Sequence, residues 1–222
     1  MSDILIHCAF NRKDTNVDSK NENLNAVKTL IEQIKKIKST VKFINISSTS
    51  AYENAKSAYG MIKYKIEKEV NLNNGINIRP GIIYGHNSNQ GSFNQIAKLV
   101  KVLPIIPYFS SIKNPTYTTH IDDLCSVIEK ISQSELSDTY YAAAEKRIYF
   151  KEIIQSIVTE RKLRRLLLPI HWKLALYKFF ILEKLQIKFG SFTSDSIISL
   201  ANENENAKDK INNKYQNDFR NL

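Results

Sequence analysis

The stretch VKFINISSTSAYENAKSAYGMIKYKIEKEVNLNNGINIRPG, residues 41–81, decides the fold. Its first six residues form a short apolar run that predicts a buried strand, and INIR near its end predicts another. Between them, Ile62, Ile66 and Val70 recur at a spacing of four, which is typical of an amphipathic helix. Ser57 is suited to cap the first turn of that helix. The stretch therefore predicts a strand, a helix and a parallel strand.

The residues before this stretch repeat the pattern. Ile4–Ala9 is a short apolar run that predicts a strand, and residues 25–38 carry apolar side chains at spacings of three and four, as in a helix. Strands that alternate with amphipathic helices predict an α/β fold with a parallel sheet. Such sheets bind ligands beyond the carboxyl ends of their strands. Those ends hold His7–Phe10, Ser47–Thr49 and Arg79–Gly81.

Beyond residue 81 the pattern is less regular. We expect helices at 93–102, 124–131 and 150–159, an extended proline-bounded segment at 103–107 and a short strand at 140–144. The expected organisation is a sheet domain at 1–85, a C-terminal region at 86–201 that is interleaved with the sheet, and a polar tail at 202–222.

The composition excludes several classes of protein. The chain has 222 residues, a net charge of +10, six glycines, two cysteines and four histidines. Neither G-x-G-x-x-G nor G-x-x-x-x-G-K-S/T occurs. Two cysteines and scattered histidines predict neither a disulfide framework nor a metal site. The sequence shows no signal peptide and no run of about 18 apolar residues, so we expect a cytoplasmic protein.

Tyr59 and Lys63 are the strongest candidates for catalysis. A phenol keeps its proton at neutral pH, but a nearby ammonium stabilises the phenolate, so a Tyr-x-x-x-Lys pair on one helix face suits proton transfer. The hydroxyl of Ser48, at the end of the adjacent predicted strand, could bond the same substrate oxygen. The chain contains three such pairs, Tyr52/Lys56, Tyr59/Lys63 and Tyr64/Lys68. Of these, only Tyr59/Lys63 is expected both to begin in the first turn of the helix and to lie near Ser48.

Six short motifs, in this order, resemble the NAD(P)-dependent epimerase/dehydratase family, the extended short-chain dehydrogenase/reductases. The motifs are DILIHCA at 3–9, Asn25 with Thr29, FINISS at 43–48, Tyr59-Gly60-x-x-Lys63 followed by Glu67, RPGIIYG at 79–85, and HIDDL at 120–124. The stretch FTSDS at 192–196 is more loosely similar to the C-terminal parts of polysaccharide-associated members. The resemblance implies a Rossmann-like fold with a smaller, mostly helical C-terminal region.

The resemblance also implies roles for the site residues. Ser48 would polarise the substrate oxygen, Tyr59 would transfer the proton, and Lys63 would support Tyr59 and bind the nicotinamide ribose. The cofactor, NAD or NADP, would be bound by His7, Cys8, Ala9, Phe10, Ser47, Tyr59, Lys63, Arg79, Pro80, Gly81 and Ile82. The substrate would be a nucleotide-linked sugar or a similar hydroxyl or keto compound.

The chain departs from the family at its start. Members begin with a glycine-rich β-α-β unit that holds the cofactor pyrophosphate, whereas this chain begins at what resembles their fourth strand. We therefore expect an N-terminally truncated member that binds the cofactor weakly or not at all when alone. A homodimer or a complementing N-terminal segment is the expected partner. The alternative is a non-catalytic remnant or a partner-dependent interaction module.

Residues 151–190 are both basic and apolar. They hold nine Lys and Arg residues and three Glu residues, among many Leu, Ile and Phe residues. One interpretation is a helix that lies on an anionic membrane surface. The favoured interpretation is a small substrate domain whose apolar faces pack together while its lysines point outward. No nucleic-acid-binding motif accompanies the charge, so no nucleic-acid partner is expected.

Overall fold

The computed structural model describes residues 4–37, 41–85, 91–112, 114–134, 138–187, 192–203 and 219–222. Its main sheet has the strand order β1-β2-β3-β7, and every neighbouring pair is parallel. The strands are β1 (Ile4–His7), β2 (Lys42–Ile46), β3 (Ile76–Pro80) and β7 (Thr139–Ala142). This arrangement confirms the predicted parallel α/β fold.

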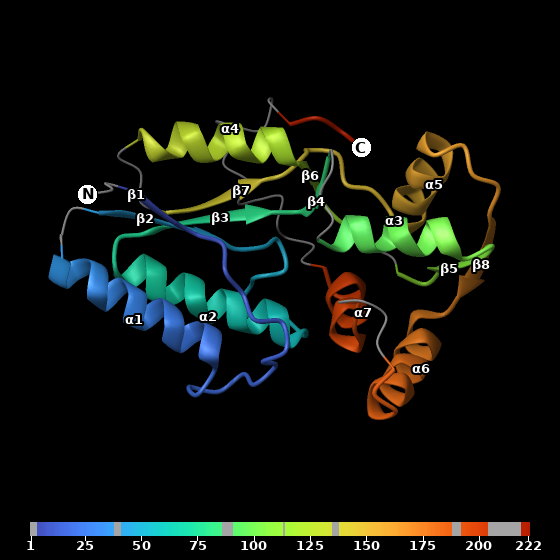
Figure 1. Ribbon diagram of the computed structural model, residues 1–222, viewed down its shortest axis with the longest axis horizontal. Coiled ribbons are helices and arrows are strands. Elements are labelled where there is room, and N and C mark those ends of the chain that lie inside the picture. The colour runs from blue at the N-terminus through green and yellow to red at the C-terminus, as the bar shows by residue number, and fades with distance from the viewer. Residues whose placement is uncertain are drawn as a thin grey trace.

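Helices cover both faces of the main sheet (Figure 1). On one face lie α1 (Glu22–Ile37) and α2 (Ala58–Leu72), which pack on Phe43 of β2 through the predicted apolar stripes. On the other face lies α4 (Ile121–Ser132), which packs on the isoleucines of β2 and β3. Alternate strand residues point to opposite faces, so one strand serves both layers.

The remaining elements form a second body beside the carboxyl ends of the strands. It contains α3 (Ser92–Val102), α5 (Phe150–Glu160), α6 (Trp172–Lys184) and α7 (Ser194–Ala201). Two short parallel pairs accompany these helices: β4 (Ile82–Tyr84) with β6 (Thr118–His120), and β5 (Ile105–Phe109) with β8 (Leu166–Ile170). Helices were predicted near α3, α4 and α5, and the proline-bounded segment contributes to β5.

Residues 151–190 only partly follow the packing that the sequence favoured. In α5, Ile153, Ile154 and Ile157 are fully buried against α3 and β5. In α6, Ala175 is the one buried residue, and half of the eight large apolar side chains are exposed. The predicted packing of apolar faces is therefore found in α5, whereas α6 packs only one side of its apolar surface.

The end of the chain returns to the main sheet. Most of the predicted tail, residues 204–218, lies outside the described residues. Phe219 packs in the hydrophobic cluster between α4 and the main sheet. The Arg220 side chain donates two hydrogen bonds to Oδ1 of Asp123, at 2.6 and 2.8 Å. In the part of the chain that the structure describes, no helix is long and apolar enough to cross a membrane.

Candidate functional site

A cleft of about 1420 Å³ opens beyond the carboxyl ends of β1, β2 and β3. Its floor is formed by the loops that follow these strands and by the first turns of α2. Its opposite wall is formed by residues of α6 and α7 and by Glu203. The cleft therefore lies where parallel α/β sheets place their ligand sites.

Tyr59 lies in the first turn of α2, at the edge of this cleft. The predicted cap is present, because the Ser57 hydroxyl accepts a hydrogen bond from the amide of Gly60 at 3.1 Å. The Phe10 ring meets the Tyr59 ring edge-on at 5.0 Å between centroids. The guanidinium of Arg12 lies 5.1 Å from the centroid of the Tyr59 ring. Residues of the loop after β1 thus hold the phenol ring.

Lys63 is one helical turn further along α2 and is buried. Its ammonium donates a hydrogen bond to the carbonyl of Ile46, at the end of β2, at 2.8 Å. The same nitrogen lies 4.8 Å from the centroid of the Phe10 ring and 6.0 Å from that of Tyr59. The cation is therefore fixed beside the rings of Phe10 and Tyr59.

Ser48 follows β2 and lines the same cleft. Its hydroxyl accepts a hydrogen bond from the amide of Ser50 at 3.2 Å, which holds the turn of the loop. Within the described residues, no hydrogen bond joins Ser48 to Tyr59. The neighbouring Ser47 hydroxyl is buried in the cleft wall and has no hydrogen-bond partner in the described part of the chain.

The structure brings most of the predicted cofactor-binding residues to the cleft, but not all. Those that line it are Cys8, Phe10, Ser47, Tyr59, Lys63, Pro80, Gly81 and Ile82. His7, Ala9 and Arg79 are absent from its lining. The His7 ring instead pairs with the Asn45 side chain at 3.2 Å, and burial lowers its pKa. Burial also raises the pKa of the Cys8 thiol.

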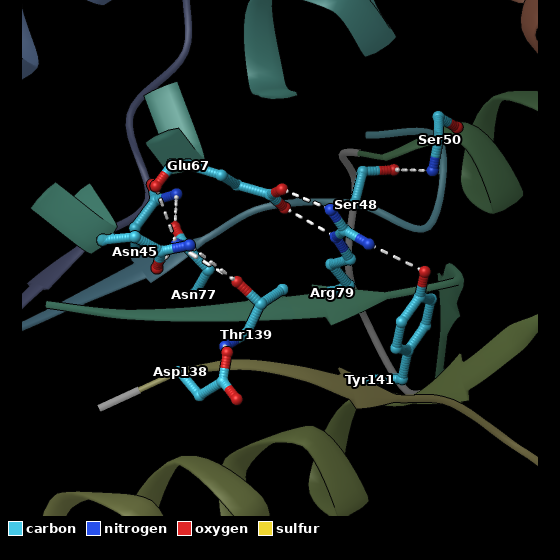
Figure 2. A network of polar contacts seen from close by, with 10 residues as sticks. Asn45, Ser48, Ser50, Glu67, Asn77, Arg79, Asp138, Thr139 and Tyr141 are labelled. Atoms are coloured by element: carbon cyan, nitrogen blue, oxygen red, sulfur yellow. Dashed lines mark hydrogen bonds and ion pairs between the residues drawn. The ribbon is translucent and has the colours of Figure 1, made fainter. Parts of the chain in front are cut away.

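Arg79 occupies the interface between α2 and β3 (Figure 2). Its guanidinium donates to both carboxylate oxygens of Glu67 and, at 2.7 Å, to the Tyr141 hydroxyl. Burial lowers the pKa of the Arg79 guanidinium. The hydrogen bonds and the charge of Glu67 outweigh this effect of burial, so the pKa is raised overall. Glu67 lies one turn beyond Lys63, so the ion pair fixes the helix that carries the Tyr-Lys pair.

Two residues of the cleft were not found by sequence reasoning. The Asp195 carboxylate accepts hydrogen bonds from the amides of Ala58 and Tyr59, at 2.7 and 3.0 Å. The Glu203 carboxyl is buried in the cleft wall, and burial raises its pKa to about 7. Among the residues that the structure describes, its Oε1 has no hydrogen-bond partner. Asp195 belongs to the loosely recognised FTSDS stretch. Glu203 lies in an Asn- and Glu-rich stretch that carries no pattern.

The other two Tyr-x-x-x-Lys pairs differ in position. The Lys68 ammonium lies 4.8 Å from the centroid of its own partner ring, Tyr64, and neither residue lines the cleft. The hydroxyl of Tyr52 donates a hydrogen bond to the carbonyl of Asn202. Of the three pairs, only Tyr59 and Lys63 lie on the cleft. The described residues contain no cluster of three His, Cys, Asp or Glu residues placed to bind a metal ion.

No protein-family model and no curated protein sequence matches the chain. Solved structures do. The UDP-glucose 4-epimerase of Thermus thermophilus, complexed with NAD, aligns with a TM-score of 0.62 and 16% identity over 76% of this chain and 65% of its own. The dTDP-glucose 4,6-dehydratase of Bacillus anthracis, also in complex with NAD, aligns with a TM-score of 0.61 and 15% identity over 76% of this chain and 61% of its own. The chain thus spans less than two thirds of either structure.

The UDP-N-acetylglucosamine 4-epimerase of Bacillus cereus aligns over a larger share. Its TM-score is 0.61 and its identity 16%, over 90% of this chain and 77% of that one. Identities this low establish the fold alone. The chain therefore has the Rossmann-like fold of the NAD-dependent nucleotide-sugar epimerases, dehydratases and reductases, the extended short-chain dehydrogenase/reductase fold that its motifs predicted.

Proposed function

We propose that the chain carries the catalytic residues of an NAD(P)-dependent epimerase/dehydratase-like oxidoreductase. The observation that supports this most directly is the meeting of Ser48, Tyr59 and Lys63 on one cleft at the carboxyl ends of the strands. They come from a strand end and from two successive turns of one helix. Neither of the other Tyr-Lys pairs has a comparable position.

Each of the three groups has a distinct role. The Tyr59 hydroxyl transfers a proton to or from the substrate oxygen, and the Ser48 hydroxyl bonds that same oxygen and orients it. The buried Lys63 ammonium stabilises the phenolate that forms when Tyr59 gives up its proton. The Phe10 ring and the Arg12 guanidinium, both in the loop after β1, hold Tyr59 in place. The bound nicotinamide would supply the hydride acceptor or donor.

The residues at the cleft fit the nicotinamide half of the cofactor. Lys63 has three N–H donors and uses one on the Ile46 carbonyl, which leaves donors for ribose hydroxyls. The unpartnered Ser47 hydroxyl, buried in the cleft wall, is a further polar group that a ligand would satisfy. The sequence contains no glycine-rich loop of the kind that cradles the pyrophosphate. We therefore expect this chain to bind the cofactor weakly.

For the substrate we propose a nucleotide-linked sugar or a similar hydroxyl or keto compound. A cleft of about 1420 Å³ is larger than a typical pocket for a drug-sized ligand. It has room for a nicotinamide and a sugar nucleotide together. Solved structures of the same fold include an epimerase with UDP-glucose and another protein with UDP-glucose and NAD.

The second candidate function is a partner-dependent interaction module. It is favoured by the open edge of the main sheet. Among the described strands, β1 pairs only with β2, and Ile6 on it is 46% exposed. An unpaired strand edge can pair with another chain.

Calorimetric titration of NAD+ and NADP+ into the full chain tests the cofactor proposal. We expect binding with a Kd of about 1 mM for one of them. Lys63→Met removes the donors to the ribose, so it should abolish the heat of binding. Lys68→Met, on the outer face of the same helix, should leave it unchanged. Absence of binding at about 10 mM, or equal binding by both variants, contradicts the proposal and favours the interaction module.

Turnover tests the role of the phenol. Tyr59→Phe keeps the ring packing with Phe10 but removes the hydroxyl, so we expect the turnover of UDP- and dTDP-linked glucose to fall about 10²- to 10⁴-fold. The measurement follows the reduced nicotinamide and the sugar product. Tyr64→Phe, on the same helix but away from the cleft, is the matched control. A Tyr59→Phe protein with the rate of that control would show that another group transfers the proton.

A further inference from the structure

Helix α6 exposes large apolar side chains to an unusual extent. Leu174, Tyr177 and Ile181 are 52, 64 and 41% exposed, and Leu185, which follows the helix, is 64% exposed. These four residues are spaced by three, four and four, so they form one stripe along the helix. A contiguous apolar stripe that no other described element covers marks a contact surface.

The stripe is separate from the cleft. Phe179, Phe180 and Glu183 of the same helix line the cleft, and Ala175 is buried on this side of the helix. At 3.6 residues per turn Ala175, Phe179 and Glu183 share one side of α6, and the exposed stripe lies on the other side. Glu183 is held on the inner side, where its carboxylate accepts two hydrogen bonds from Ser194. The only acidic residue of α6 is thus turned away from the stripe.

Lysines border the stripe on both sides. By the same helical geometry, Lys173 and Lys184 flank one margin and Lys178 flanks the other. All three are exposed. Long lysine stems extend along an apolar surface while their ammonium groups reach an outer polar layer. An apolar centre between cationic margins is the pattern of a helix that lies at the surface of an anionic bilayer.

The strand pair before α6 adds a second exposed apolar surface. Ile105 and Leu166 are register partners in β5 and β8, and Leu168 lies on the same face as Leu166. They are 48, 63 and 48% exposed. The opposite face of this pair carries Ile106 and Leu167, which pack in the core. Both exposed surfaces belong to the end of the molecule that lies away from β1 (Figure 1).

We propose that the outer face of α6 binds the surface of an anionic lipid bilayer. The charge of residues 151–190, nine basic against three acidic, is complementary to anionic headgroups. The helix is too short to cross a membrane and suits the interface instead. This contact would leave the cleft, on the other side of α6, open to a ligand. The inference does not depend on the proposed catalytic activity.

Co-sedimentation of the full chain with lipid vesicles tests this proposal. We expect binding to phosphatidylcholine vesicles that contain phosphatidylglycerol. Binding to pure phosphatidylcholine, or in high salt, should be at least tenfold weaker, because several lysines contribute to the attraction. Equal binding to both kinds of vesicle, or none to either, overturns the proposal.

Matched variants identify the surface. Leu174→Ser with Ile181→Ser removes the centre of the stripe and should lower vesicle partitioning about tenfold or more. Ile37→Ser with Leu72→Ser removes two side chains that are 66 and 80% exposed on other helices, and it should change nothing. If the two double variants bind alike, the stripe is not the contact. A different result would also overturn the proposal: the unmodified chain binds no vesicles and forms a dimer, and only Leu174→Ser with Ile181→Ser makes it monomeric. The stripe would then be a contact between two copies of the chain.

Discussion

The amides of Ala58 and Tyr59 both donate to one carboxylate, that of Asp195 in α7. The first amides of a helix have no partner within it, and an anion there also interacts favourably with the helix dipole. Asp195 therefore fixes the turn that presents the candidate phenol. The residue is 136 positions away from Tyr59 in sequence, so it also ties the C-terminal region to the main sheet.

Asp195→Ala should lower the free energy of unfolding by about 1–2 kcal/mol, because two amides lose a charged acceptor. Urea unfolding followed by circular dichroism measures this. Asp122→Ala is the control, because that carboxylate lies in the first turn of α4, is 63% exposed and makes long ion pairs, at 3.5 Å, with His120 and Arg220. Equal effects of the two substitutions would show that Asp195 is no more than a surface charge.

The Glu203 carboxyl provides a pH-dependent contribution. Burial is the main cause that raises its pKa from 4.5 to about 7. Between these values the folded chain holds a proton that the unfolded chain has released. The stability from this group is therefore fully present below about pH 4.5 and is lost as the pH rises through about 7.

Glu203→Gln removes this ionisation. We expect the variant to match the wild type in unfolding free energy at about pH 4.5 and to exceed it by about 3 kcal/mol at about pH 8. Denaturant titrations at several pH values measure the difference, and groups such as His7 cancel because both proteins carry them. Glu145→Gln, at an exposed position, is the control and should show no such trend. A pH-independent difference for Glu203→Gln would contradict a titration in this range.

At the scale of elements, α2 is fixed to β3 by the buried pair of Glu67 and Arg79 (Figure 2). Removal of one partner leaves the other as an uncompensated buried charge. Arg79→Met should therefore lower the free energy of unfolding by about 3–5 kcal/mol, and Arg79→Met with Glu67→Gln should lower it by less. Urea unfolding measures the free energy of unfolding of the single and the double variant and so resolves the difference between them.

The salt bridge between Lys28 of α1 and Glu69 of α2 provides a comparison. It is 3.7 Å long and partly exposed, so Lys28→Ala should cost no more than about 1 kcal/mol. If Arg79→Met costs as little, or if the double variant is no more stable than the single one, the buried pair does not fix α2 in the way proposed.

The sequence predicted those elements whose signal is local. The apolar spacing and the Ser57 cap of α2 lie within one helix, and the strands beside it are short apolar runs. The pairing of β5 with β8 was not predicted, because it joins segments about 60 residues apart. The exposure of α6 was not predicted either, since an apolar stripe in a sequence does not reveal whether another element covers it.

In the candidate site, too, the residues in local motifs were predicted and those placed by tertiary packing were not. Ser48 follows a predicted strand, and Tyr59 and Lys63 belong to a local motif in the next helix, at the edge where parallel sheets place ligand sites. Asp195 and Glu203 reach the cleft only through tertiary packing of the C-terminal region, so no local pattern identified them. Arg79 was expected beside the cofactor and lies instead outside the lining of the cleft, in a pair with a glutamate twelve residues earlier.

At the scale of the whole molecule, the last described residues stabilise the main sheet. Phe219 is 9% exposed and lies in the cluster that also holds Leu124 and Val127 of α4. Phe219→Ala should lower the free energy of unfolding by about 3 kcal/mol, because it leaves a cavity in that cluster. Urea unfolding measures the change, with Leu72→Ala, at an exposed position, as the control. If the two variants unfold alike, the end of the chain is not part of the core, and the sheet is stabilised by the residues before it.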